Sequence, residues 1–273
     1  DVTFGGGGHS REIMSRLGEG GKLFGFDQDL DALKNAIDDE RFMLINENFR
    51  FIKRFLRFHG IKQVDGILAD LGVSSHQFDV AERGFSTRFE AELDMRMNQK
   101  GEISAYNVIN EYDEQEISRV LFNYGELKNA RAMANVIVLA RQEAPIKNSE
   151  QLKQILARFL PGHKSNKILA QIYQAIRIEV NQEMDVLKEF LEQSLEILKP
   201  GGRLSVISYH SLEDRLVKRF VKNGMFEGEP ERDFFGNFEV PFKTIEKLIV
   251  PSDEEIALNN RARSAKLRVA EKK

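Results

Sequence analysis

Four consecutive glycines at residues 5–8 constrain the fold of this chain more than any other feature. Strand-forming residues precede them, and an amphipathic helix follows, which Ser10 is expected to cap. Glycines let the backbone approach a ligand closely, and the helix N-terminus offers N–H groups to it. A second strand ends about twenty residues later at Asp27, whose carboxylate suits ribose hydroxyl groups. A lone glycine loop is usually an ordinary turn, but this series of elements predicts a nucleoside-cofactor site.

The chain begins very close to this loop. A glycine loop of this kind needs a full strand before it, and only Thr3 and Phe4 have the character of strand formers. We therefore expect native residues to precede Asp1.

Short apolar strands alternate with amphipathic helices after the glycine loop. Strands are expected at 23–26, 42–45 and 64–69, and helices at 30–36 and 51–56. This alternation implies right-handed crossovers and therefore a doubly wound, mostly parallel sheet of the α/β class. In such a sheet, ligands bind at the carboxyl ends of the strands.

Two side chains follow strands at this edge of the predicted sheet. Asp70 comes directly after the strand at 64–69, and an acidic residue there favours a role in the site over a structural cap. Phe49 follows the strand at 42–45. It either stacks on an adenine or packs beneath the next helix, and position alone does not decide between them.

The alternation stops after residue 102. A long connection precedes that point, at roughly 78–100, and long ordered loops usually carry a function. From 103 to 177 the apolar spacing predicts helices only, which indicates an all-helical domain inserted between the fourth and fifth strands. The predicted domains are the first part of the sheet domain, the helical insertion and the second part of the sheet domain: 1–102, 103–177 and 178–273.

The α/β pattern resumes after the insertion. A long amphipathic helix at 184–198 ends in a turn at 199–202, and a strand follows at 203–208. The last two apolar stretches, 244–250 and 265–270, predict a final antiparallel pair.

The composition excludes several kinds of chemistry. The chain has no cysteine, which excludes disulfides, thiolate metal sites and thiol attack on a pyrimidine ring carbon. Its five histidines are too scattered to predict a metal site, so no metal is expected. No apolar run approaches the length of a membrane span, and we expect a cytoplasmic protein without membrane contact.

The net charge of −3 argues against a generally basic nucleic-acid-binding protein, but it averages over local clusters. Three clusters of Lys and Arg stand out: Arg50, Lys53, Arg54 and Arg57; Arg215, Lys218, Arg219 and Lys222; Arg261, Arg263, Lys266 and Arg268. Each is either a solvated face or a contact for a polyanion.

With these residues assembled, the chain resembles the bacterial small-subunit ribosomal RNA cytidine N4-methyltransferase family (RsmH, formerly MraW). The matching motifs cover nearly the whole chain, and the long loop motifs are specific to that family. They lie at residues 3–5, 7–11, 70–75, 81–86, 93–97, 208, 210–215 and 260–268. Tyr209 stands where the family often has phenylalanine, and His76 stands where it usually has proline.

The resemblance implies a class I, Rossmann-like methyltransferase that uses S-adenosylmethionine and whose inserted helical domain helps to bind RNA. The implied reaction places a methyl group on the exocyclic N4 of a cytidine in small-subunit ribosomal RNA, either free or in the assembled small subunit. The implied cofactor contacts are Gly7, Gly8, His9, Asp27, Phe49, Asp70 and Gln77. Of these, His9 and Gln77 rest on the resemblance alone.

The absence of cysteine agrees with this reaction, because methylation of an exocyclic amine needs no covalent ring adduct. The amine must approach the methyl group in line, within about 3–3.5 Å, and must lose a proton to an acceptor. Asp70 is the first candidate for that acceptor, with Ser74 or His210 assisting.

Three further side chains are expected to bind the RNA substrate, namely Arg83, Phe85 and Arg215. Phe85 is either a stacking surface for an exposed cytidine or part of the packing of its loop.

Other functions remain open at this point. The first alternative is a related methyltransferase acting on another RNA or on a protein amine. A nicotinamide-dependent dehydrogenase would also need the glycine loop and Asp27, although the order of the glycines and the helical insertion are unusual for one. A third alternative is a non-catalytic RNA-binding assembly protein. The sequence also leaves the oligomeric state open, a homodimer included.

Overall fold

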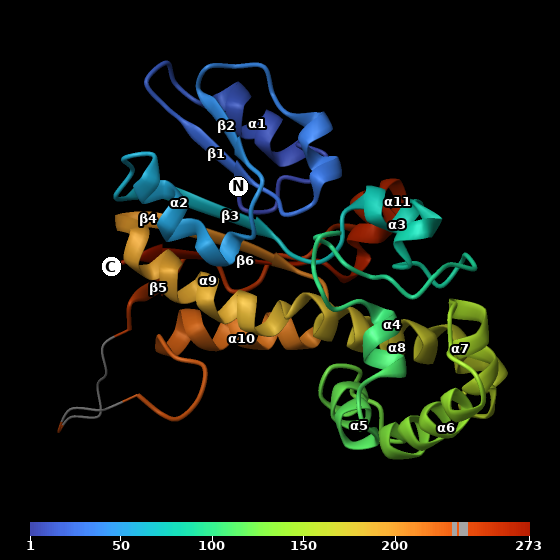
Figure 1. The fold of residues 1–273 in the computed structure, drawn as a ribbon. Coiled ribbons are helices and arrows are strands. Elements are labelled where there is room, and N and C mark those ends of the chain that lie inside the picture. The colour runs from blue at the N-terminus through green and yellow to red at the C-terminus, as the bar shows by residue number, and fades with distance from the viewer. Residues whose placement is uncertain (231–233, 235–239) are drawn as a thin grey trace. The chain divides into compact units, whose positions relative to one another are not determined.

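The computed structural model describes residues 1–230, 234 and 240–273. These residues divide into two compact units (Figure 1), each with its own hydrophobic core. The sheet unit comprises Asp1–Gly72 with Met184–Lys273, and the helical unit comprises Val73–Glu183. Within the described residues, no helix is both long and apolar enough to cross a membrane.

Short β-sheets form the framework of the sheet unit. Their strands are β1 (Leu23–Phe26), β2 (Phe42–Ile45), β3 (Val64–Asp70), β4 (Leu198–Ser208), β5 (Phe242–Thr244) and β6 (Lys266–Lys272). β1 pairs with β2 in parallel, and β3 pairs with β4 in parallel. β6 runs antiparallel between β4 and β5, so this sheet has the order β3-β4-β6-β5.

Residues 1–4 lie between these sheets and are hydrogen-bonded to both. The Val2 N–H donates to the Leu68 carbonyl of β3 at 2.8 Å, and the Phe4 N–H donates to the Phe26 carbonyl of β1 at 2.9 Å. The glycine loop that follows therefore lies beside the ends of β1 and β3. The predicted α/β fold with parallel strand pairs is confirmed. An antiparallel pair is present near the end of the chain, but its first strand is Phe242–Thr244. Of the predicted stretch 244–250, only Thr244 lies in that strand, and Ile249 forms an isolated antiparallel bridge to Leu267.

Helices pack on this framework because their apolar residues recur at helical spacing. They are α1 (Gly8–Arg16), η1 (Leu30–Asn35), η2 (Phe49–Phe51), α2 (Ile52–Phe58), α9 (Glu183–Ile197), α10 (Ser211–Asn223), α11 (Asp253–Leu258) and η6 (Asn260–Ser264). In Figure 1, α9 and α10 run alongside the strands β3, β4 and β6. α9 contributes Leu187, Phe190 and Leu191 to the core of the unit. Each such side chain stabilises the fold by roughly 1.5–3 kcal/mol.

Two local predictions differ from the structure. The expected amphipathic helix at 30–36 is the short 3-10 helix η1, in which Leu30 is 39% exposed and Leu33 is 41% exposed. Residues three apart lie on the same face of a 3-10 helix, and here that face points to solvent. The expected turn at 199–202 falls within β4, where the pairing with β3 shifts between Val64 and Gly66.

The helical unit consists of short helices around its own core. They are α3 (Ser75–Asp79), η3 (Ala81–Arg83), α4 (Ala105–Asn110), α5 (Glu114–Asn123), α6 (Ala130–Glu143), α7 (Ser149–Ile155), η4 (Ala157–Phe159), η5 (Gly162–Lys164) and α8 (Ser165–Asn181). Buried side chains from several of them, including Leu121, Ile137 and Ile172, fill this core.

The compact helical unit is wider than the predicted insertion at 103–177. Phe85, Leu93 and Met95 come from the long connection before that range, yet they are buried in the helical core. The Ala105 N–H also donates to the Asp94 carbonyl at 2.7 Å, which ties α4 to this connection. The connection therefore folds together with the helices that follow it.

Candidate active site

Asp70 is held at the C-terminal end of β3 by contacts from several segments of the sheet unit. Its backbone N–H donates to the Thr3 hydroxyl oxygen at 2.7 Å. One carboxylate oxygen, Oδ2, lies 3.3 Å from His9 Nε2, and the other, Oδ1, accepts a hydrogen bond from the Tyr209 hydroxyl at 2.9 Å. The side chain of Asp70 is 27% exposed, so its carboxylate is fixed by the protein and still reaches solvent.

The protonation of these two partners follows from their surroundings. The hydrogen bond to Asp70 raises the pKa of His9, and the negative charge of Asp70 adds to this effect, while partial burial opposes it. Burial raises the pKa of Tyr209, and the charge of Asp70 raises it further. Tyr209 therefore keeps its proton, and because a carboxylate only accepts, the hydroxyl is the donor.

The glycine loop contains two residues with left-handed backbone, Gly5 and Gly7, and it is open on either side of Gly7. Gly7 has φ 77°, and a Cβ there would lie 2.9 Å from the Phe4 ring. A Cβ at Gly6 or at Gly8 would meet nothing within 4 Å. Arg11 holds the loop by donating from Nη1 to the Gly6 carbonyl at 2.6 Å. The open positions form a cradle that a close-lying ligand can use.

The expected N-cap of α1 is wrong. Ser10 is fully buried inside the helix, and its hydroxyl donates to Asp1 Oδ2 at 2.7 Å. The N-cap is Gly7, which offers no side-chain acceptor. Because no side chain caps the helix, its first N–H groups are presented to the surroundings of the glycine loop, which suits polar atoms of a ligand.

Asp27 comes directly after β1, as predicted, and faces the same loop. Its Oδ2 accepts from the Gly5 N–H at 2.7 Å, and its Oδ1 accepts from the Asp29 N–H at 2.8 Å. Asn35 completes the frame by donating to the Gly5 carbonyl at 3.1 Å. The hydroxyl groups of a nucleoside ribose need a hydrogen-bond acceptor beside a space that the ligand can enter. The Asp27 carboxylate next to the open glycine loop meets this need, so these residues fit such a cofactor.

Phe49 shows the packing alternative in this structure. It is the first residue of η2, and its ring meets the Phe190 ring edge-on, with the centroids 5.2 Å apart. The loop before it is tied to the β1 end, since Asn46 donates to the Asp27 carbonyl at 2.8 Å. Its expected contact with an adenine stays a prediction.

His210 and Arg215 belong to the start of α10. His210 is the N-cap, and its Nδ1 accepts from the Glu213 N–H at 3.4 Å. The buried Glu213 side chain reaches back and accepts from the Tyr209 and His210 N–H groups at 2.9 and 3.3 Å. Arg215 is exposed on the helix surface. The structure thus gives His210 a capping role, and its expected catalytic role stays a prediction.

Ser74 and Gln77 lie in the helical unit, where they form the capping box of α3. The Ser74 hydroxyl oxygen accepts from the Gln77 N–H at 3.2 Å, and Gln77 Oε1 accepts from the Ser74 N–H at 3.0 Å. Gln77 is buried. A capping box accounts for both residue types at this spacing, and their expected catalytic and cofactor roles stay predictions.

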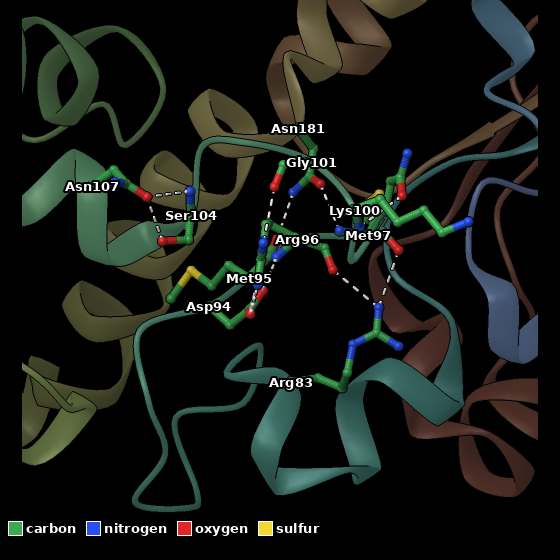
Figure 2. Close-up of polar contacts among 11 residues, drawn as sticks. Arg83, Asp94, Met95, Arg96, Met97, Lys100, Gly101, Ser104, Asn107 and Asn181 are labelled. Carbon is green, nitrogen blue, oxygen red and sulfur yellow. Dashed lines mark hydrogen bonds and ion pairs between the residues drawn. The ribbon is translucent and has the colours of Figure 1, made fainter.

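Arg83 is buried and braces the loop at residues 95–97 from inside (Figure 2). Its Nη2 donates to the carbonyls of Arg96 and Met97 at 3.0 and 3.1 Å. Asn181 holds the same loop with two hydrogen bonds of 2.8 Å. Its Nδ2 donates to the Met95 carbonyl, and its Oδ1 accepts from the Met97 N–H. Met95 between them is fully buried and has φ 58°, a strained conformation that these contacts hold.

Phe85 is also buried in the helical core, at 5% exposure, with the Arg83 guanidinium 5.8 Å from its ring centre. In this arrangement the ring packs inside its loop, so stacking on a base would require the ring to become exposed. The RNA contacts expected of Arg83 and Phe85 are therefore not visible here, and both side chains serve the packing of the helical unit.

Several residues that build the site were missed by sequence reasoning. Thr3 supports Asp70, Arg11 and Asn35 hold the glycine loop, and Tyr209 donates to the Asp70 carboxylate. Each acts on a residue distant in the chain, and no spacing rule points to such a partner. The strand-end position of Tyr209 was the only available signal.

A parallel sheet with an open glycine loop and acidic residues at its strand ends defines an α/β protein that binds a nucleoside cofactor. The model of the MraW methylase family matches residues 1–273. The chain belongs to the MraW methylase family.

Relatives of known name agree with this membership over the full length of the chain. A protein of Flavobacterium johnsoniae named "Ribosomal RNA small subunit methyltransferase H" is 78% identical over 272 residues, which cover 100% of this chain and 90% of that protein. Proteins of the same name from Flavobacterium psychrophilum and Bacteroides fragilis are 75% and 56% identical, with 100% of this chain and 94% and 90% of those proteins covered. The predicted family and enzyme class are confirmed, and S-adenosylmethionine is the methyl donor that fits this class.

Proposed function

We propose that this methyltransferase places a methyl group on the exocyclic N4 of a cytidine in small-subunit ribosomal RNA, in the cytoplasm. The shared name of its relatives supports the RNA, and the family motifs support the cytidine amine. The absence of cysteine fits an amine as the acceptor, because carbon methylation of a pyrimidine through a thiol adduct is excluded.

One observation carries the proposal. Asp70 lies at the end of β3, and its Oδ2 is 3.3 Å from Nε2 of His9. His9 belongs to α1, the helix that follows the glycine loop. A carboxylate able to handle a proton is thus fixed directly beside the loop that fits a nucleoside cofactor. That juxtaposition is what transfer of a group from such a cofactor requires.

The residues of the glycine loop and of strand β1 would hold the cofactor. Gly6 and Gly8 leave room for close approach, and the uncapped start of α1 offers N–H groups. Asp27 would accept hydrogen bonds from ribose hydroxyl groups. When bound, S-adenosylmethionine supplies a methyl group on a positively charged sulfonium.

Asp70 would accept the proton that the cytidine amine loses. The lone pair of that amine is delocalised into the ring, and an acceptor beside its N–H localises the pair on nitrogen. As the amine nitrogen takes up the methyl group, its proton would pass to the Asp70 carboxylate. The Tyr209 hydroxyl donates to Asp70 Oδ1, and His9 Nε2 lies 3.3 Å from Asp70 Oδ2, so both residues hold the carboxylate in position.

The helical unit would contact the RNA backbone through a segment without acidic residues. Residues 151–178, which we call the acid-free segment, contain Lys153, Arg158, Lys164, Lys167 and Arg177 but no Asp or Glu. Lys153 is paired with Glu150, and Arg177 is paired with Glu183. Arg158, Lys164 and Lys167 are exposed on η4, η5 and the start of α8. Exposed cations in a stretch without acids suit a row of phosphates.

Some of the Lys and Arg residues clustered in the sheet unit are engaged in ion pairs within the chain. Arg50 and Lys53 form ion pairs with Glu189 and Glu196 of α9. Lys266 and Arg268 both pair with Asp214. These four cations stabilise the sheet unit, and we propose the acid-free segment, with its three exposed cations, as the contact for RNA.

The catalytic part of the proposal is tested by Asp70→Ala in single-turnover methyl transfer. Labelled cofactor at saturating concentration is mixed with small-subunit RNA, naked or assembled, because these conditions isolate the chemical step from product release. Loss of the acceptor should lower the rate by about 10²–10⁴. A rate that returns to near wild type once the cofactor saturates would show that Asp70 only binds the cofactor.

A further inference from the structure

Tyr209 is connected to the proposed reaction through one hydrogen bond. It stands between the end of β4 and the start of α10, and its hydroxyl donates to Asp70 Oδ1 at 2.9 Å. Nothing in the proposed reaction requires a phenol to exchange protons. The hydroxyl therefore has a role other than proton transfer, and the contacts of Tyr209 indicate which role that is.

The backbone and the ring of Tyr209 are both held by contacts, and these fix the position of its hydroxyl. The backbone N–H of Tyr209 donates to the buried Glu213 carboxylate at 2.9 Å. Its ring lies against Gly72, where an added Cβ would be 3.7 Å from Tyr209 Cδ2. Backbone and ring are thus both held within the sheet unit, and the hydroxyl is a stationary donor.

A stationary donor matters because the end of an aspartate side chain is otherwise loosely oriented. Rotation of the carboxylate plane about χ2 has a broad minimum. In Asp70 the two oxygens have different donors, Tyr209 for Oδ1 and His9 for Oδ2, while Thr3 holds the backbone N–H. Donors on both oxygens fix the plane of the carboxylate as well as its position.

We propose that Tyr209 is a positioning residue for methyl transfer, whose hydroxyl fixes the orientation in which the Asp70 carboxylate meets the amine of the substrate. The inference rests on the proposed function, because it requires Asp70 to act on that amine. Burial and the charge of Asp70 raise the pKa of Tyr209, so the phenol stays protonated and keeps donating.

The direct test is Tyr209→Phe, which removes one oxygen and keeps the ring against Gly72. Single-turnover transfer at saturating cofactor should slow roughly tenfold, the effect of one such hydrogen bond. The affinity for S-adenosylhomocysteine, measured by calorimetry, should stay unchanged. A residue with a merely structural role would instead lower the melting temperature and leave the rate of the folded protein as it was.

His9 offers a second readout that does not depend on activity. Its pKa is raised by Asp70. In Tyr209→Phe the carboxylate loses a competing donor and binds the His9 proton more strongly, so the pKa of His9 in an NMR titration should rise further. The matched control is Tyr173→Phe, which removes the hydroxyl of a buried tyrosine in the helical unit and should leave both the rate and the pKa of His9 unchanged.

A double-mutant cycle with Asp70→Asn separates this inference from the proposed function. The inference is supported if methyl transfer is slow in Tyr209→Phe and slower still in Asp70→Asn. The double variant must then transfer the methyl group no more slowly than Asp70→Asn alone. If Asp70→Asn is slow but Tyr209→Phe is as fast as wild type, the positioning role is overturned and the proposed function stands. Tyr209→Phe slowing Asp70→Asn by a further tenfold overturns it too, since the hydroxyl would then act elsewhere. Wild-type rates in Asp70→Asn would overturn both.

Discussion

Gly7 and Gly8 are neighbours in the glycine loop, but the fold itself requires glycine only at position 7. Gly7 has a left-handed backbone, and its missing side chain leaves space for the Phe4 ring. Gly8 has no such φ, and an added Cβ would meet nothing within 4 Å. The fold therefore requires glycine at position 7, whereas only a bound ligand would require it at position 8.

The two positions predict opposite outcomes for substitution by alanine. Gly7→Ala should destabilise the protein by about 1–2 kcal/mol, the cost of a left-handed residue with a side chain. Gly8→Ala should keep the melting temperature or raise it, since alanine favours a helix, yet weaken cofactor binding by steric conflict. Thermal unfolding and calorimetry with S-adenosylhomocysteine check both. Unchanged affinity in Gly8→Ala would remove this position from the cofactor site.

Individual residues show where sequence reasoning succeeds and where it stops. Asp27 and Asp70 were predicted at their strand ends because a short apolar run defines its own end. Ser10 was misassigned because the N-cap depends on where the helix begins. The N-cap is the left-handed Gly7, so the helix begins at Gly8, before Ser10. Tyr209, Thr3 and Asn35 act through contacts distant in the chain, which no local pattern encodes.

At the scale of elements, the apolar pattern was informative where an element is buried on a definite face. β2 and β3 were predicted at or within one residue of their bounds, and α9 follows its apolar spacing. η1 was mistaken for a longer amphipathic helix because two leucines three apart fit either helix type. The buried positions of Phe85 and Met95 could not be predicted, since they depend on helices that follow them in the chain.

The acid-free segment predicts an effect that depends on salt. Replacing Lys164 and Lys167 by Gln should weaken RNA binding and lower the slope of log affinity against log salt by about 1.5–2, the loss of two phosphate contacts. Cofactor affinity should not change. The matched control, Lys188→Gln with Lys199→Gln, removes equal charge from lysines of the sheet unit that face Asp185 and Asp65. Equal slopes for the two pairs would count against the assignment.

The junction of α10 and β6 predicts an effect that depends on pH. Burial disfavours the charged form of Asp214, but hydrogen bonds and charges from Arg268 and Lys266 outweigh it, so its pKa is lowered. The carboxylate therefore contributes stability above its ordinary pKa of 3.8, and this contribution is lost as the pH falls through the lowered value.

Asp214→Asn should accordingly reduce the free energy of unfolding at pH 7 by roughly 1.5–3 kcal/mol. The difference from wild type should shrink as the pH falls below 3.8. Urea unfolding at several pH values measures it, with Asp65→Asn, which alters an exposed carboxylate, as the control. A difference that stays constant down to the acid end would show that the ion pairs are not its cause.

At the scale of the whole molecule, the proposed cofactor site and the proposed RNA contact lie in different units, each with its own core. The sheet unit contains the glycine loop, Asp27 and Asp70, and the helical unit contains the acid-free segment. The boundary at residue 73 differs from the predicted 103 because the connection at 78–100 has little helical pattern of its own but is buried in the helical core. Methyl transfer to RNA would need both units.

Nucleoside mass spectrometry shows directly whether the protein methylates N4 of a cytidine in small-subunit RNA. Small-subunit RNA, naked and in assembled small subunits, is incubated with the full chain and S-adenosylmethionine, then digested to nucleosides. We expect one new product, cytidine methylated on N4, which is absent when Asp70→Ala replaces the wild-type protein. A methyl group on another base, on a ring carbon or on a protein amine, or no transfer to either form of the RNA, would contradict it.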